Sequence, residues 1–333
     1  MEIVCVTGAG GFVASWAVKE LLAKGYVVHG TVRDPDDKKK NGHLKKLEHA
    51  KERLHLFKAD LLDYDSLCTA ISGCTGVIHV ATPVPAGKVA DPQADMLKPA
   101  ITGTRNVMNA CLESKVKKVV VVSSILAISA NPSWPKDQTM DENCWTDADY
   151  CMKAEKWYSA SKAISEREAL EFGKMNNLNV VSICPSVVFG PMLQSTLCTT
   201  NIILQNFFKG ENSFNLIEFD RAEEDIFVPI VDVRDCAKAL LLAYEKPEAE
   251  GRYLCSSHCL KITALIEMLK RLFPHYNYPS NLPVSNEQLN YTCEKLLNLG
   301  WNYMPLEKTL ADSVERMKEA KFSTLILVLY ACN

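Results

Sequence analysis

EIVCVTGAGGFVA, at residues 2–14, is the segment that most strongly indicates the fold class of this chain. Residues 2–7 are apolar and rich in β-branched side chains, which predicts a strand buried on both faces. A glycine-rich turn follows, and a helical pattern comes next. This order is typical of a dinucleotide-binding turn, in which Gly8 permits the sharp bend, Gly11 lets backbone amides approach a pyrophosphate, and Ala14 allows close packing. A tight strand–helix turn without a ligand is the alternative.

The alternation of strand and helix patterns continues through the first half of the chain. Apolar runs predict further strands at 26–32, 54–57, 76–81, 119–122 and 180–184, and helical patterns predict helices at 64–71 and about 96–114. Repeated units of this kind imply an α/β fold, a Rossmann-type doubly wound parallel sheet with helices on both faces.

Three residue pairs sit where these predicted strands end. In doubly wound sheets ligands bind beyond the carboxyl ends of the strands, so the pairs are expected to border a cofactor. They are Asp60-Leu61, Ala81-Thr82 and Ser123-Ser124. His79 lies within a strand, and we expect a structural role for it.

The end of the second strand bears on the choice of cofactor. An acid at this position holds the ribose hydroxyls of NAD, whereas an arginine accommodates the 2′-phosphate of NADP. Arg33 and Asp34 are adjacent here, so the position alone leaves both open. The basic run Lys38 to Lys40 favours a phosphate and therefore NADP, although a solvated lysine loop is the alternative.

A tyrosine and a lysine four residues apart form a second candidate site. Residues 149–174 contain no proline and one late glycine, which predicts a single long helix. On a helix, Tyr158 and Lys162 project from the same face, one turn apart. The ammonium is expected to lower the tyrosine pKa from its reference of ~10, which suits a proton donor to a carbonyl oxygen. Many exposed helices carry such a pair by chance.

The composition excludes several other classes of function. The chain has 333 residues, 47% apolar and 23% charged, and a net charge of −3, which is typical of a globular protein without a basic field for nucleic acid or membrane. The N-terminus lacks signal-peptide features, and the thirteen scattered cysteines include no C-x-x-C, so we expect reduced thiols in the cytoplasm. Cys255, His258 and Cys259 lack a fourth-ligand motif, so no metal is predicted. No G-x-S-x-G elbow or phosphate loop is present.

Together these features identify a family. TGAGGFVA, Asp60-Leu61, Ser123-Ser124 and the Tyr158–Lys162 pair resemble the extended short-chain dehydrogenases/reductases. More narrowly, KADLLDYDSL, GCTGVIHVATPV, DENCWTDADYC and EGRYLCSS resemble the plant branch of cinnamoyl-CoA reductase and dihydroflavonol 4-reductase. The resemblance runs from about residue 3 to about residue 318.

The resemblance implies a catalytic set and a cofactor site. Ser124, Tyr158 and Lys162 would be catalytic, with Tyr158 as proton donor to a carbonyl that accepts hydride from NADP(H). Many extended members carry an Asn where this chain has Ala100, so a proton relay through that position is not expected. The residues expected to bind the cofactor are Gly8, Gly11, Phe12, Val13, Arg33, Lys40, Asp60, Leu61, Val80, Ala81, Thr82, Ser123, Tyr158, Lys162, Pro185 and Val188.

The second half of the chain is expected to build a substrate-binding lobe. The NADP-binding domain would comprise residues 1–189, with 226–246 returning to it, and the lobe would comprise 190–225 and 247–320. Helices are predicted at 196–209 and 233–244 and a strand at 225–231, and 321–333 form an apolar tail too short to span a bilayer. Expected substrate contacts are Ser124, Ile125, Tyr158, Phe189, Met192 and Phe227, with Thr82, Pro83, Ser159, Leu193 and Ile203 as further pocket candidates.

Substrate choice follows from departures from the family pattern. Cinnamoyl-CoA reductases carry NWYCYGK, whereas this chain has Ser159-Ala160-Ser161 after Tyr158. They also place a His and a Lys for the CoA phosphates where this chain has Ile203 and Asn206, and losing such contacts weakens CoA binding. We therefore expect a reductase of hydroxycinnamaldehydes, a short-chain form of cinnamyl-alcohol dehydrogenase. The alternatives are cinnamoyl-CoA reductase, dihydroflavonol 4-reductase, and a silent NADP(H)-binding sensor.

Overall fold

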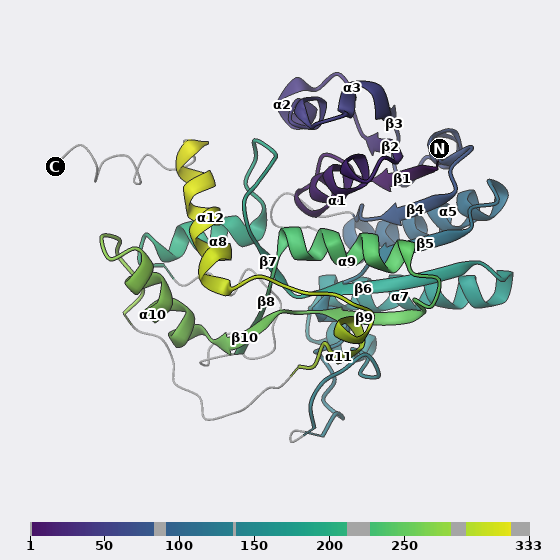
Figure 1. Cartoon of the computed structure of the whole chain (residues 1–333). Helices are drawn as coiled ribbons and strands as arrows, with labels where there is room; N and C mark the ends of the chain where they lie inside the picture. The colour runs from purple at the N-terminus through teal and green to yellow at the C-terminus, as the bar shows by residue number, and fades with distance from the viewer. Residues whose placement is uncertain (1, 83–90, 136–137, 212–226, 281–290, 321–333) are drawn as a thin grey trace.

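A computed structural model describes residues 2–82, 91–135, 138–211, 227–280 and 291–320. In these residues a seven-stranded parallel sheet forms the larger part of the molecule, in the order β3-β2-β1-β4-β5-β6-β9 (Figure 1). Its strands are β1 (Ile3–Thr7), β2 (Val27–Val32), β3 (Leu54–Lys58), β4 (Gly76–His79), β5 (Lys118–Val122), β6 (Asn179–Pro185) and β9 (Gly251–Cys255). The chain reverses direction across the sheet between β1 and β4, and such a switch point is where ligands bind in doubly wound folds. The predicted Rossmann-type sheet is confirmed.

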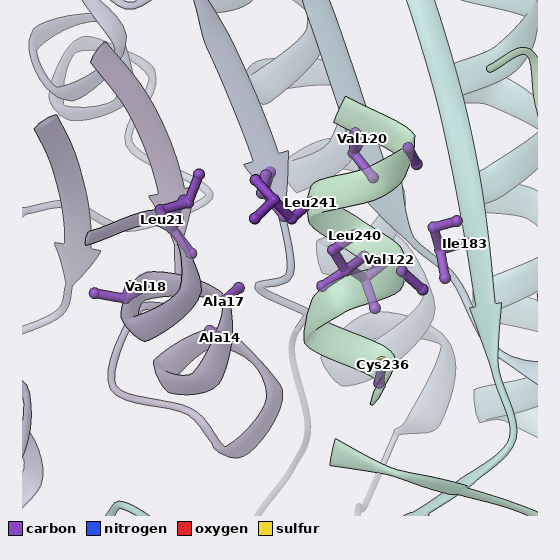
Figure 2. Close-up of a cluster of buried hydrophobic side chains, with 14 of the residues drawn as sticks. Ala14, Ala17, Val18, Leu21, Val120, Val122, Ile183, Cys236, Leu240 and Leu241 are labelled. Atoms are coloured by element: carbon purple, nitrogen blue, oxygen red, sulfur yellow. The ribbon is translucent and has the colours of Figure 1, made fainter. Parts of the chain in front are cut away.

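Helices cover both faces of this sheet because its strands are apolar on both sides. In β5, Val119 and Val121 pack under α4 (Tyr64–Ile71) and α5 (Lys98–Glu113), whereas Val120 and Val122 face α1 (Phe12–Ala23) and α9 (Val233–Glu245). Figure 2 shows the second layer, in which α9, with Leu240 and Leu241, lies beside α1 on the same face of the sheet.

A smaller mixed sheet and its helices form a separate lobe (Figure 1). Its order is β10-β8-β7, with β8 antiparallel to β10 and parallel to β7. The lobe consists of β7 (Val187–Phe189), α8 (Thr199–Phe207), β8 (Phe227–Asp232), β10 (His258–Lys261), α10 (Ile262–Leu272) and α12 (Leu306–Glu319). A continuous hydrophobic core joins this lobe to the segment that follows β5.

Shorter elements occupy the connections. They are α2 (Lys38–Asn41), η1 (Leu44–Lys46), α3 (Ala50–Arg53), η2 (Gln93–Leu97), η3 (Ile125–Ala127), α6 (Ala148–Lys153) and α11 (Glu294–Asn298). Within the described ranges, no helix is long and apolar enough to cross a membrane, and no group of three or more His, Cys, Asp or Glu side chains is arranged to hold a metal.

Two strands lie in a different sheet from the one that the expected domain boundaries imply. β9 pairs with β6 and adds the last strand to the main sheet, although 247–320 was assigned to the lobe. β8 pairs with β7 and β10 in the small sheet, although 226–246 was assigned to the main domain. Apolar runs of this length carry no signal for the partner strand, so the sequence did not predict which sheet these two strands join.

The helix predicted over 149–174 is broken. α6 ends at Lys153, Glu155 adopts a left-handed φ of 58°, and a new helix, α7 (Trp157–Asn176), begins two residues later. The amide of Lys156 turns back to the carbonyl of Cys151 at 2.8 Å, which closes the end of α6. No proline or glycine marks the break, so the sequence pattern missed it. Tyr158 consequently lies in the first turn of α7.

Three expectations fall on residues outside the described ranges. They concern Pro83 as a pocket residue, the start of a strand at Asp225, and the tail 321–333.

Candidate active site

The glycine turn after β1 has the geometry of a phosphate-binding turn. Gly8 has a φ of 67°, and a Cβ added there would lie 3.1 Å from the Cβ of Ala81. Gly11 forms the N-cap of α1 without any side-chain cap, so the first amides of the helix, at Phe12 and Val13, have no intrahelical partner. An anion at this helix N-terminus would satisfy those amides, so the turn fits the pyrophosphate of a dinucleotide.

The basic residues after β2 are exposed. Arg33 lies in solvent at the carboxyl end of β2, and the Lys40 side chain is 73% exposed in a weak pair with Asp37 at 3.6 Å. Asp34 is used locally, because its Oδ1 accepts the amide of Asp36 at 3.0 Å. One oxygen of the Asp34 carboxylate is thus engaged in a turn, while the guanidinium of Arg33 is exposed.

A buried threonine organises the ends of β1 and β4. Thr7 Oγ1 accepts the amides of Val80 and Ala81 at 3.1 and 3.0 Å, and it lies 2.8 Å from His79 Nδ1. Burial lowers the pKa of His79 to about 3, with the positive charge of Lys162 as a smaller cause, so the imidazole is neutral. His79 therefore serves the backbone at the strand ends, which agrees with the structural role expected for it.

Ser124 begins a one-turn 3-10 helix directly beyond β5. Its Oγ accepts the amide of Leu126 at 3.2 Å, and its carbonyl accepts the amide of Ala127 at 3.0 Å. The side chain is half-buried, and a hydroxyl that accepts one hydrogen bond keeps its own proton to donate. Ser124 thus keeps a hydroxyl proton that it can donate at the carboxyl edge of the sheet.

Lys162 is buried on α7, one turn after Tyr158. Its side chain is 7% exposed, and Nζ donates to the carbonyl oxygen of Val122 at 2.8 Å. Burial lowers the pKa of Lys162 to about 8, opposed by the negative charge of Glu166 and by Cys184. The half-buried Tyr158 packs against the hydrophobic core of the lobe. The predicted pair therefore lies between the sheet and the lobe rather than on an exposed helix face.

A polar pocket lies beside Lys162. Thr104 Oγ1 donates to the carbonyl of Ala100 at 2.9 Å, and the buried Ser165 Oγ has no hydrogen-bond partner among the described residues. The polar residues that line the pocket are His79, Thr82, Thr104, Ser123, Lys162, Ser165 and Glu166. Four of the predicted catalytic and cofactor positions, Ala81, Thr82, Ser123 and Lys162, thus line the same cavity.

The other predicted residues divide into strand ends and core. Asp60 is exposed and Leu61 half-buried at the end of β3, whereas Pro185 is buried and Val188 half-buried at the end of β6 and in β7. Phe227 is half-buried at the start of β8. The core of the lobe contains Ile125, Phe189, Met192 and Ile203. Whether any of these contacts a ligand stays a prediction.

A buried ion pair was missed by the sequence analysis. Glu166 and Arg252 are joined by hydrogen bonds of 2.8 and 3.1 Å, and Ser123 Oγ donates to the same carboxylate at 2.7 Å. Glu166 follows Lys162 by four residues, so its place on the same face of α7 was available from the spacing. Arg252, 86 residues further along, gave no such signal.

Comparison with known proteins finds similarity along nearly the whole chain. A family model described as the NAD dependent epimerase/dehydratase family matches residues 4–255. Cinnamoyl-CoA reductase 1 of Petunia hybrida is 42% identical over 322 residues, which cover 96% of this chain and 92% of that protein. Vestitone reductase from alfalfa (Medicago sativa L.) superposes with a TM-score of 0.81 at 28% identity, covering 97% and 100% of the two chains. Gre2 from Candida albicans, in complex with NADPH, superposes with a TM-score of 0.80 at 29% identity, covering 96% and 99%.

Proposed function

Since this chain belongs to the NAD-dependent epimerase/dehydratase family, within the extended short-chain dehydrogenases/reductases, we propose that it reduces a phenylpropanoid carbonyl with NADPH. Membership of the plant cinnamoyl-CoA reductase and dihydroflavonol reductase-like branch makes it an NAD(P)H-dependent oxidoreductase acting on carbonyl groups. NADPH rather than NADH is supported by the exposed Arg33 at the end of β2 and by the NADPH complex of the related Gre2.

The catalytic roles rest on three side chains at the carboxyl edge of the main sheet. NADPH, when bound, supplies a hydride to the carbonyl carbon. Tyr158 donates the proton to the carbonyl oxygen, and the hydroxyl of Ser124 donates a hydrogen bond to the same oxygen. The ammonium of Lys162 stabilises the negative charge that develops on the tyrosine oxygen as its proton leaves.

One observation carries this proposal furthest. A lysine ammonium with only 7% of its side chain exposed is costly, yet Lys162 is placed one helical turn from Tyr158 and bonded to Val122, two residues before Ser124. A buried ammonium at this position has a functional role if negative charge develops on the neighbouring Tyr158 during the reaction.

The relatives favour a CoA thioester as substrate, in preference to the free aldehyde that the sequence departures suggested. Cinnamoyl-CoA reductase 1 of Petunia hybrida matches over 96% of this chain, and we propose a hydroxycinnamoyl-CoA as the first substrate. Once the thioester carbonyl has accepted hydride and the proton of Tyr158, the resulting hemithioacetal releases the CoA thiol and leaves the aldehyde.

A free hydroxycinnamaldehyde is the second candidate, and a specific observation favours it. Ile203 on α8 is fully buried in the lobe core. The resemblance to cinnamoyl-CoA reductases aligns this position with a histidine for the CoA phosphates. Asn206, one turn later on α8, is uncharged. A substrate without phosphates needs neither contact.

Side-by-side assays separate these candidates. Purified protein would be supplied with NADPH and with feruloyl-CoA, coniferaldehyde or dihydroquercetin, and oxidation of NADPH followed. The highest kcat/KM for feruloyl-CoA would support the thioester, and the highest for coniferaldehyde would support the aldehyde. If the protein binds NADPH but oxidises it with none of the three substrates, the proposed reduction is contradicted. The protein would then bind the cofactor without turnover.

A further inference from the structure

Glu166 on α7 is a fully engaged buried carboxylate. It is 1% exposed, and it accepts hydrogen bonds from Arg252 Nε and Nη2 at 2.8 and 3.1 Å, from Ser123 Oγ at 2.7 Å, and from Cys184 Sγ at 3.2 Å. Removing two charges from water is costly, and a buried ion pair stabilises a protein little more than apolar residues of the same shape. Stability alone therefore gives a weak account of this pair.

The remaining donors of Arg252 hold the chain that follows Ser124. Nη2 donates to the carbonyl of Ala127 at 3.2 Å, and Nη1 donates to the carbonyls of Glu142 and Cys144 at 3.0 and 2.8 Å. The guanidinium also stacks 3.5 Å from the ring centroid of Trp145. One arginine on β9 thus fixes both ends of the segment between the 3-10 turn of Ser124 and α6.

The pair joins the two elements that carry the proposed catalytic groups. Ser124 belongs to the segment after β5, whereas Tyr158 and Lys162 belong to α7. Glu166 accepts a hydrogen bond from Ser123, the neighbour of Ser124, and it lies one helical turn beyond Lys162. We propose that the Glu166–Arg252 ion pair is a positioning unit, which fixes Ser124 relative to Tyr158 and Lys162 and places one negative charge beside the lysine. This inference rests on the catalytic roles proposed above.

The charges around Lys162 give this unit an electrostatic effect as well. The titratable and charged neighbours of Lys162 are Tyr158 and Glu166 on its own helix, His79 on β4, Cys184 on β6 and Arg252 on β9. Arg252 lies behind the carboxylate of Glu166. The pKa of His79 is far below neutrality, and burial holds Cys184 as a thiol, so the carboxylate of Glu166 is the anionic neighbour of the ammonium. It raises the pKa of Lys162 against the opposite effect of burial.

Two substitutions separate the positioning of Ser124 from the effect of the negative charge beside Lys162. Glu166→Gln removes the negative charge and keeps an acceptor for Ser123. Arg252→Lys keeps the positive charge but loses the planar fork that reaches three carbonyls. kcat, KM for NADPH and for the best substrate, and the pH profile of kcat would be measured for both, with NADPH affinity from fluorescence and a thermal melt as measures of folding.

The expected results differ between the two variants. Glu166→Gln should lower kcat roughly ten- to hundredfold with KM for NADPH within about twofold, and should move the alkaline fall of kcat to lower pH by about one unit. Arg252→Lys should lower kcat by a similar factor while the alkaline fall stays in place, because the carboxylate remains. The matched control is Glu168→Gln, a half-buried residue of α7 whose pair with Arg105 of α5 at 2.6 Å lies outside the site, and it should leave both readouts unchanged.

Several outcomes would overturn the proposal. Unchanged kcat and an unchanged pH profile in a folded Glu166→Gln variant would do so, and so would a loss of kcat that merely follows a loss of folded protein in both variants. Tyr158→Phe, measured in parallel, distinguishes this failure from failure of the proposed function. If Tyr158→Phe is inactive while Glu166→Gln matches the unmodified protein, only the positioning unit is wrong. If Tyr158→Phe keeps its activity, the catalytic assignment itself is wrong.

Discussion

Lys162 on α7 donates a 2.8 Å hydrogen bond from Nζ to the carbonyl oxygen of Val122, the last residue of β5. The bond ties the helix that carries Tyr158 to the strand that leads into Ser124. Because the ammonium is buried, its pKa is lowered to about 8, which is close to neutral pH. The charge that is proposed to assist proton transfer can therefore be lost by raising the pH.

The rate of carbonyl reduction should fall as the pH rises through about 8, since the neutral lysine no longer stabilises negative charge on Tyr158. Initial rates of NADPH oxidation at saturating substrate, measured from pH 6 to pH 10, would locate this fall. In Lys162→Arg, which stays charged throughout, kcat should be lower but flat across the same range. A rate that holds to pH 10 in the unmodified protein would argue against Lys162 as the titrating group.

The buried ammonium of Lys162 should lower the free energy of unfolding at neutral pH. Its pKa is about 8 when folded and 10.5 when unfolded, so between these values the unfolded chain binds more protons and the free energy of unfolding rises with pH. Below pH 8 the cost is present in full. Lys162→Met should therefore raise the free energy of unfolding by about 2 kcal/mol at pH 7, net of the lost bond to Val122.

Urea unfolding at pH 7 and at pH 10.5 tests this sign. The advantage of Lys162→Met should shrink or vanish at the higher pH, while its reductase activity is lost at both. A variant that is less stable at pH 7 would show that the buried charge is fully compensated by its surroundings.

Arg33 should determine the preference for NADPH over NADH. A charge-assisted hydrogen bond to phosphate contributes about 1.5–3 kcal/mol, so Arg33→Gln should lower the ratio of kcat/KM for NADPH to that for NADH by roughly 10- to 150-fold. Lys174→Gln, at the far end of α7, removes an equal charge away from β2 and should leave the ratio unchanged. An unaltered ratio in Arg33→Gln would assign the 2′-phosphate to other residues.

Gly8 should contribute to cofactor binding as well as to stability. Alanine there meets both a φ of 67° and a contact of 3.1 Å with the Cβ of Ala81, whereas alanine at Gly73 meets a φ of 76° and open space. Both variants should lose roughly 1 kcal/mol of stability to backbone strain. Only Gly8→Ala should also weaken NADPH binding, measured by fluorescence quenching. Equal affinity in the two variants would remove the turn after β1 from the cofactor site.

The sequence predicted the order of the elements because each one carries its own signal. The consecutive valines of β5 and the glycines of the first turn report on burial and backbone conformation residue by residue. Ser124, which follows β5, lies at the carboxyl edge of the sheet for the same reason, since strand ends can be located from such patterns.

Features that depend on distant residues could not be predicted in this way. The break at Glu155 has no glycine or proline, the sheet that β9 joins depends on an open edge of β6, and Arg252 meets Glu166 across 86 positions. A helix or strand pattern is local, whereas these choices are made by packing and by the pairing of buried charges.

The central claim is that the hydroxyl of Tyr158 protonates the carbonyl oxygen. The most direct test is kcat of Tyr158→Phe with NADPH and the best substrate, alongside NADPH affinity, with Tyr26→Phe as a control that loses only an exposed bond to Glu245. We predict that Tyr158→Phe lowers kcat about 10²- to 10⁴-fold with NADPH affinity preserved, and that Tyr26→Phe leaves kcat unchanged. Undiminished turnover in a folded Tyr158→Phe variant that still binds NADPH would contradict the account.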